Sequence, residues 1–158
     1  MKHLILPLLL ASAALATSAA ADPASDVVAP IHQFIDGFNH GDTAAGFAAY
    51  DSGTIAIVDE FAPHQWIGPN AAHDWADEYG RHSTANQITD GIVTYGAATR
   101  TEIEGDAAYV IVPTVYTYRE HGRPIAEEGQ MTFVLHRRAA GWRIAGWTWS
   151  GVPPHAAR

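Results

Sequence analysis

Residues 107–138, AAYVIVPTVYTYREHGRPIAEEGQMTFVLHRR, contain two long runs of β-branched and aromatic residues joined by His121-Gly122. Such residues favour strands, and a glycine-containing pair between two runs favours a turn, so the stretch predicts a hairpin with strands at 107–120 and 125–138. Strands linked in this way pair antiparallel. Similar runs predict further strands at 88–103 and 142–150.

The first half of the chain has helical periodicity instead. Val27, Ile31, Phe34 and Phe38 recur at spacings of four, three and four, which places them on one face of a helix. Asp42 can cap a second, short helix that reaches Tyr50. A strand is expected at Thr54–Val58.

A third helix is expected after Gly68, because Pro69 suits the first helical position and Gly80 suits the helix end. Its apolar face would be formed by Ala72, Trp75, Ala76 and Tyr79. Three helices in the N-terminal half followed by consecutive strands predict an α+β fold, with the helices packed on the concave face of a curved antiparallel sheet.

Residues 1–21 have the pattern of a signal peptide. Lys2 precedes an apolar run from Leu4 to Ala16, and small residues follow, with Ala19-Ala20-Ala21 fitting a cleavage site after Ala21. The apolar run is short for a membrane span, and no later segment offers one. We therefore expect a periplasmic or secreted protein whose single domain covers residues 22–158; the alternative is a retained N-terminal anchor.

The composition excludes several classes of function. Residues 22–158 have a formal net charge of −9, which argues against nucleic acid and anionic lipid as partners. The chain has no cysteine, so disulfides, thiol nucleophiles and thiolate metal sites are excluded. It has no phosphate loop, dinucleotide fingerprint or Gly-x-Ser-x-Gly motif, and its nine histidines are scattered without an HExxH spacing. We expect neither a cofactor nor a metal site.

The stretch DEFAPHQW, residues 59–66, places two carboxylates directly after the strand at 54–58. Asp59 is either a catalytic base at the mouth of a pocket or the acidic end of a strand, bonded to backbone N–H groups or to an arginine such as Arg143. Because side chains alternate along a strand, Glu60 is expected on the opposite side, in solvent.

Three short pieces carry a resemblance to a known superfamily: FIDGFNHGD at 34–42, GPNAA at 68–72 and GWRI at 141–144. In this order they resemble the nuclear transport factor 2-like superfamily, which includes ketosteroid isomerase, scytalone dehydratase and the SnoaL-like polyketide cyclases. The resemblance covers nearly all of residues 22–158 and implies a cone-shaped fold. The chain is most similar to exported SnoaL-like proteins with an Asp-Glu-Phe…Pro…Trp…Gly stretch, many of which have no assigned activity.

The resemblance implies a role for Asp59. In ketosteroid isomerases the general base lies nine residues before the glycine that opens the third helix, and Asp59 lies nine residues before Gly68. Burial in an apolar pocket would raise the pKa of such a base. The isomerase oxyanion donors correspond to Phe34 and to a position near Met131, neither of which can donate, so a standard ketosteroid isomerase is not expected. His64, close to Asp59 in sequence, or a pocket tyrosine is the expected acid or polarising group; the alternative for His64 is a rim residue without a role.

The resemblance also implies the orientation of the strand at 107–120. Tyr109, Ile111 and Val115 would face the cone, and Tyr116 and Tyr118 would lie on the outer sheet face. An exposed apolar stripe usually marks an interface, so a homodimer through the outer sheet face is expected. The full set of expected ligand contacts is Phe34, Trp66, Trp75, Tyr95, Tyr109, Ile111, Val115, Met131 and Trp149.

Three hypotheses about function remain open at this point. The first is a cofactor-free isomerase, dehydratase or cyclase that acts on a small hydrophobic carbonyl compound, with Asp59 as general base and either His64 or a pocket tyrosine as its partner. The second is a module that binds a small hydrophobic ligand without turnover. The third is an interaction domain that uses its outer sheet face.

Overall fold

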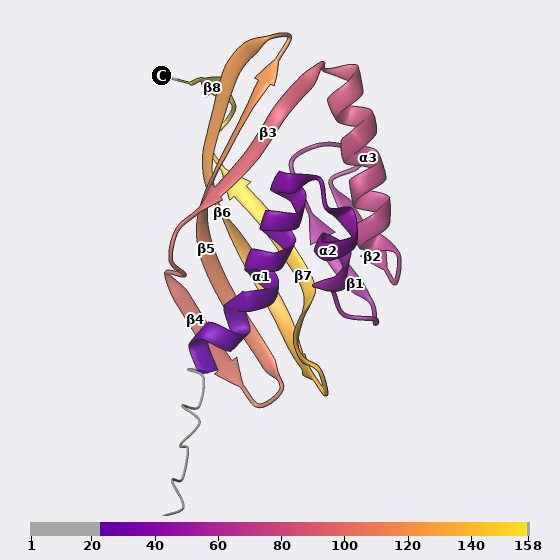
Figure 1. Ribbon diagram of the computed structural model, residues 1–158, viewed down its shortest axis with the longest axis vertical. Coiled ribbons are helices and arrows are strands. Elements are labelled where there is room, and N and C mark those ends of the chain that lie inside the picture. Colours follow the sequence, from indigo (N-terminus) through magenta and orange to yellow (C-terminus); the bar gives the residue numbers. More distant parts are fainter. Residues whose placement is uncertain (1–22, 158) are drawn as a thin grey trace, which may run out of the picture.

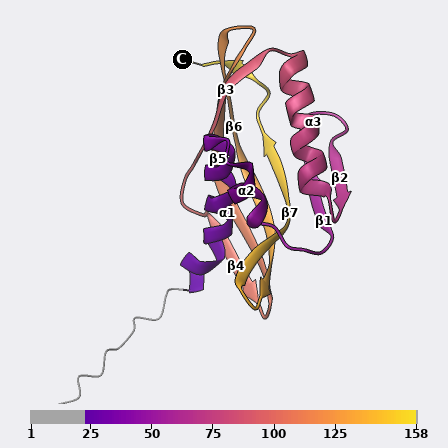
Figure 2. The same ribbon diagram turned by 45° about the vertical axis from the view of Figure 1, so that its right-hand side comes forward.

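The computed structural model describes residues 23–157 and shows helices on one side of a curved sheet (Figures 1 and 2). The three expected helices are present, and their bounds are α1 Pro23–His40, α2 Thr43–Ala48 and α3 Ala71–Ala85. The Asp42 side chain caps α2 by accepting the N–H of Ala45, as predicted. The predicted signal peptide, 1–21, lies outside the described residues.

The sheet has eight strands, in the order β2-β1-β7-β6-β5-β3, with β4 paired to β5 and β8 paired to β6. The strands are β1 Ile55–Val58, β2 Gln65–Gly68, β3 Ile88–Tyr95, β4 Arg100–Glu104, β5 Ala107–Glu120, β6 Arg123–Arg138, β7 Gly141–Gly151 and β8 His155–Ala156. The predicted hairpin is confirmed, because β5 and β6 pair antiparallel along their whole length from the turn at His121-Gly122.

The sheet is mixed and not purely antiparallel, which corrects the expectation at one edge. Strand β1 runs parallel to β7, with Ile57 opposite Trp147. Gly146 permits this pairing, since a Cβ atom there would lie 2.5 Å from the carbonyl oxygen of Ala56. Strand β2, which was not expected, completes the edge by pairing with β1.

Two other expected boundaries are wrong. The predicted strand at 88–103 is two strands, β3 and β4, which pair with different parts of β5. Helix α3 starts after Asn70 and passes through Gly80 to Ala85. Gly80 has no atom within 4 Å of where its Cβ would be, so it sits on an exposed helix face and does not end the helix.

The faces of β5 are the reverse of the expected ones. Val110, Val112 and Tyr118 point to the concave side and are at most 7% exposed, whereas Tyr109 and Ile111 lie on the outer face and are half-buried. Both faces of β5 carry apolar residues, so the two-residue alternation could not by itself tell inside from outside.

The helices cover the concave face and leave one part of it open. Helix α1 contacts β7 and β3, while α3 stands over β1, β2 and β3 (Figure 1). The core between them includes Ile31, Ile35, Phe133, Leu135 and Ile144, each at most 1% exposed. Burial of one such side chain contributes about 1.5–3 kcal/mol.

Candidate functional site

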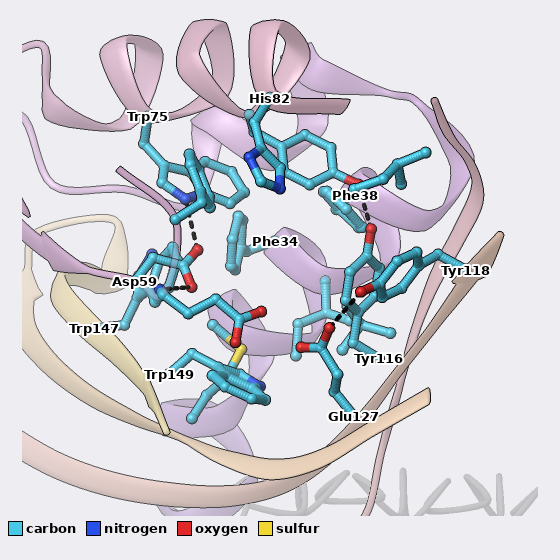
Figure 3. Close-up of a pocket in the computed structure, with 17 residues that line it drawn as sticks. Phe34, Phe38, Asp59, Trp75, His82, Tyr116, Tyr118, Glu127, Trp147 and Trp149 are labelled. Atoms are coloured by element: carbon cyan, nitrogen blue, oxygen red, sulfur yellow. Dashed lines mark hydrogen bonds between the residues drawn. The ribbon is translucent and has the colours of Figure 1, made fainter. Parts of the chain in front are cut away.

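A pocket of about 720 Å³, including its open mouth, lies between α1, α3 and the concave face of the sheet (Figure 3). Its walls come from six elements and from the loop after β1. The lining residues are Phe34, Ile35, Phe38, Asp59, Glu60, Phe61, Trp75, Tyr79, His82, Ile88, Val93, Tyr116, Tyr118, Glu127, Met131, Trp147 and Trp149. Sites for small molecules commonly have this apolar character, with a few polar groups among aromatic side chains.

Asp59 is held in the pocket wall by two hydrogen bonds. Its Oδ1 accepts the backbone N–H of Glu60 at 2.8 Å, and its Oδ2 accepts the indole N–H of Trp75 at 2.9 Å. Burial raises the pKa of Asp59, and the Trp75 N–H opposes the rise because it stabilises the ionised form. Asp59 is therefore an oriented carboxyl group that can hold or release a proton, and Arg143, the possible partner, bonds instead to the Trp142 carbonyl.

A second acidic group lies on β6. Glu127 is 1% exposed, and its Oε1 accepts the hydroxyl hydrogen of Tyr118 at 2.6 Å. Its Oε2 is buried and has no hydrogen-bond partner among the described residues. Figure 3 shows the Glu127 carboxyl directed into the pocket from the wall opposite Asp59.

Glu60 is exposed, as expected, but it lines the pocket near this second group and does not point to the opposite side. The strand ends at Val58, so the alternation of side chains does not continue, and Glu60 lines the pocket. Partial burial of its carboxyl group, together with the neighbouring Glu127 carboxyl, raises the pKa of Glu60 to about 9. Near neutral pH Glu60 is therefore protonated, and its O–H is a potential donor.

Tyrosine hydroxyls surround the same end of the pocket. The hydroxyls of Tyr79 and Tyr116 are 2.5 Å apart, and the Tyr116 and Tyr118 rings stack at 4.7 Å. Burial raises the pKa of both Tyr116 and Tyr118, so both stay protonated at neutral pH. This wall therefore offers neutral O–H groups beside carboxyl groups.

The remaining walls are aromatic and rigid. The Trp75 and Trp147 rings meet edge to face at 5.2 Å, and Phe34 lies 5.7 Å from Trp147. The Trp147 N–H donates to the Tyr50 hydroxyl at 2.7 Å, which fixes the indole. Such packed rings shape the space for a flat apolar molecule.

The structure brings some of the predicted site residues together. Asp59, Phe34, Trp75, Met131 and Trp149 all line the pocket. Their roles remain predictions, because position alone does not show what a residue does.

Other predicted site residues lie elsewhere. His64 is exposed, and its Nδ1 lies 3.3 Å from the main-chain oxygen of Asp59, away from the carboxylate. Trp66 is buried but packs on Phe61 outside the lining, at 5.1 Å. The Tyr95 hydroxyl donates to the Asp36 carboxylate at 3.1 Å. The other three, Tyr109, Ile111 and Val115, lie on the outer sheet face.

The polar and titratable lining residues that the sequence interpretation missed are Glu60, Tyr79, His82, Tyr116, Tyr118 and Glu127. A signal for the last three was present in the hairpin. A turn at His121-Gly122 places Tyr116 directly opposite Glu127, so these two share one face. An acidic residue opposite a tyrosine in the middle of an apolar hairpin marks that face as the one with polar function.

Two general searches of the described residues gave negative results. Between residues 23 and 157, no three His, Asp or Glu side chains form a group that could hold a metal ion. Within the same range, no helix combines the length and the apolar character needed to cross a membrane.

Comparison with known proteins yields structural but not sequence relatives. No family model and no curated protein sequence matches the chain. Among solved structures, hexachlorocyclohexane dehydrochlorinase LinA-type3 from Novosphingobium barchaimii is 13% identical with a TM-score of 0.70, covering 84% of this chain and 88% of that one.

Two further structures give the same result. A ketosteroid isomerase-like protein from Erwinia carotovora atroseptica is 19% identical, with a TM-score of 0.65, and covers 85% of this chain and 100% of that one. A nuclear transport factor 2-like protein from Salmonella enterica serovar Typhimurium is 14% identical, with a TM-score of 0.68, covering 82% and 91%. The chain therefore has the cone-shaped nuclear transport factor 2-like fold.

Proposed function

We propose that this protein is a cofactor-free enzyme that moves a proton on a small hydrophobic carbonyl compound, with Asp59 as the general base. One observation carries the proposal: the Asp59 carboxyl is oriented by the Trp75 N–H inside an apolar pocket that raises its pKa. A base with a raised pKa holds an abstracted proton more readily.

The opposite wall supplies what a base alone lacks. When Asp59 takes a proton from the carbon next to a carbonyl, negative charge develops on the carbonyl oxygen. Donors placed beforehand at that oxygen usually give a large part of the rate. The donors available in this pocket are protonated Glu60 and the one hydroxyl hydrogen that the Tyr79–Tyr116 pair leaves free, since Tyr118 already donates to Glu127. The proton on Asp59 then returns to another carbon, or assists loss of water, so isomerisation, dehydration and cyclisation all remain open.

The likeness to a dehydrochlorinase and to a ketosteroid isomerase-like protein supports chemistry in this cone, although at these identities it concerns the fold. His64 is not proposed as the partner of Asp59, because its ring lies outside the pocket lining. The acid role passes to the Glu60 and Glu127 pair.

The test is exchange of hydrogen for deuterium next to the carbonyl of cyclic and aromatic ketones such as 2-tetralone, followed by NMR in D₂O. This assay detects the base whatever the final product is. Asp59→Asn should remove the enzyme-dependent exchange, and Asp77→Asn, a matched change on the exposed face of α3, should not. Exchange that survives in Asp59→Asn would refute the assignment of the base.

A non-catalytic binding protein is the second candidate. Both Asp59 oxygens already accept a hydrogen bond, which is also what a purely structural carboxylate would show. Saturable binding of ketones without any exchange over a broad panel would favour this alternative.

Export and dimerisation are also proposed, and neither depends on the pocket. The pattern of residues 1–21 supports export, and cleavage after Ala21 would show as a mature N-terminus at Asp22. A homodimer through the outer sheet face stays a prediction, and its interface would now include Tyr109, Ile111 and Val115 in place of Tyr116 and Tyr118.

A further inference from the structure

The charges in the pocket are all of one sign. Asp59, Glu60 and Glu127 supply carboxyl groups, and neither lysine nor arginine is among the lining residues. His82 is the one lining side chain that can carry a positive charge. A pocket of this kind repels carboxylates and phosphates, because an anion would meet buried carboxyl groups without a compensating cation.

Glu127 shows where a ligand would interact. Its carboxyl is almost completely buried, yet Oε2 has no partner among residues 23–157, while Oε1 is satisfied by Tyr118. An unpartnered carboxylate oxygen in a buried position is costly, and native proteins seldom keep one without a reason. The neighbouring Glu60 can supply a proton to it in the free protein, but a ligand with N–H donors can do the same.

Aromatic rings stand around these carboxyl groups. Trp149, Tyr116 and Phe38 line the same end of the pocket as Glu127 (Figure 3). Ring faces attract organic cations, and the attraction strengthens when water is excluded. Carboxyl groups within an aromatic enclosure are therefore suited to an ammonium group, and a purely apolar ligand would need neither.

We propose that the substrate of this pocket is a cationic amphiphile: a body of one or two rings that carries a protonated amine, with the ammonium group bound between Glu127 and Glu60. The inference rests on the proposed function for the position of the reacting carbonyl, which would lie toward Asp59 on the opposite wall. The apolar body would then contact Phe34, Trp75 and Trp147 between the two ends.

Proton release is the second consequence. When the ammonium group takes the place of the proton held by the Glu60 and Glu127 pair, that proton leaves to the buffer. The titratable groups that face Glu127 are Asp59 and Glu60 after β1, Tyr79 and His82 on α3, and Tyr116 and Tyr118 on β5. Burial raises the pKa of Tyr116 and Tyr118, so both stay protonated throughout the neutral range.

The test is a comparison of probes that differ only in their polar group. Calorimetry on the wild-type protein at pH 7 would use tryptamine, tryptophol and indole-3-propionate, which share one ring system. Tryptamine should bind about ten-fold or more tightly than tryptophol, as expected for one buried hydrogen bond to a charged group, and indole-3-propionate should not bind. Repeating the tryptamine titration in phosphate and in Tris, which have different ionisation enthalpies, should show release of about one proton.

Two variants locate the effect. Glu127→Gln should remove both the preference for the amine and the proton release, whereas Glu128→Gln, the neighbour on the exposed side of the same strand, should keep both. Equal binding of amine and alcohol by the wild-type protein, or failure of the amine to bind, would overturn the proposal even if Glu127→Gln did not fold. Calcium and magnesium chloride are included as probes, and binding of these ions in preference to tryptamine would overturn it too.

The outcome is separable from that of the proposed function. Asp59→Asn should lose ketone exchange and still prefer tryptamine, because Glu127, the main acceptor proposed for the ammonium group, enters the pocket from the wall opposite Asp59. Exchange of ketone protons together with a preference for tryptophol would support the proposed enzyme activity and refute the cationic substrate. Amine binding without exchange on any ketone would support the cationic ligand and refute the proposed enzyme activity.

Discussion

The hydrogen bond from Trp75 to Asp59 makes a specific prediction about the proposed base. In Trp75→Phe the ring is retained and the N–H that reaches Asp59 Oδ2 at 2.9 Å is lost. Because this bond stabilises the ionised carboxylate and so opposes the effect of burial, its loss should raise the pKa of Asp59 further.

The size of the rise follows from the energy of such a bond. A hydrogen bond to a charged group contributes about 1.5–3 kcal/mol, and one pKa unit corresponds to about 1.36 kcal/mol. The pKa of Asp59 should therefore rise by about one to two units. Asp59 would then be less ionised at neutral pH, and the pH at which ketone exchange reaches half of its maximum should move up by the same amount.

The measurement is a carboxyl ¹³C NMR titration of wild-type and variant protein, with the Asp59 resonance identified by its loss in Asp59→Asn. Trp147→Phe is the matched control, since it removes a pocket indole whose N–H bonds to Tyr50 instead. Its effect on the pKa of Asp59 should be much smaller. An unchanged or lowered pKa of Asp59 in Trp75→Phe would refute the idea that the indole holds the carboxylate form.

Three further predictions concern stability. The folded-state pKa of Glu60 is raised from 4.5 to about 9, so its contribution to stability is complete below pH 4.5 and is lost as the pH rises through about 9. Glu60→Gln should therefore flatten the fall of Tm between these pH values. An unchanged slope of Tm against pH would contradict the assignment. The pKa of Asp51 is held at about 2, chiefly by Arg138, so the contribution of Asp51 to stability is present above pH 3.8 and lost as the pH falls through about 2. In urea unfolding, Arg138→Gln should lower the free energy of unfolding by about 1 kcal/mol at pH 7, a small amount because Arg138 is half exposed. The same lowering at pH 2 would count against the ion pair. A methyl group at Gly146 would lie 2.5 Å from the Ala56 carbonyl oxygen, so Gly146→Ala should destabilise the protein by about 2 kcal/mol or more. Gly80→Ala, in open space on α3, should be neutral or stabilising by up to about 1 kcal/mol. Equal changes of Tm in the two variants would argue against the β1–β7 packing.

The predictable part of this fold is the part with strong local periodicity. Val27, Ile31 and Phe34 are buried on one side of α1, as their spacing predicted. The hairpin of β5 and β6 is also where its turn placed it. The parallel pairing of β1 with β7 was not predictable in this way, because it joins segments about 90 residues apart and depends on the absence of a side chain at Gly146.

In the candidate site, too, some positions were predictable from the sequence and others were not. The position of Asp59 in the pocket agrees with its spacing from Gly68, which the fold preserves. His64 was expected beside it because the two are close in sequence. The loop turns at that point, with the Asp59 N–H bonded to the His64 carbonyl and His64 at a φ of 72°, and the imidazole is directed away from the pocket. Nearness in sequence is a poor guide to side-chain direction within a tight loop.

Glu127 was missed for a different reason, and that reason bears on function. A buried glutamate on a central strand is unfavourable for folding, so sequence rules place such a residue in solvent. The fold keeps it with only the Tyr118 hydroxyl as an observed hydrogen-bond partner, although the position lies among apolar neighbours. Leucine or methionine there would fill the pocket and stabilise the cone. A carboxyl group retained at such a position, beside a second one whose pKa it raises, is therefore better explained by what enters the pocket than by what holds the protein together.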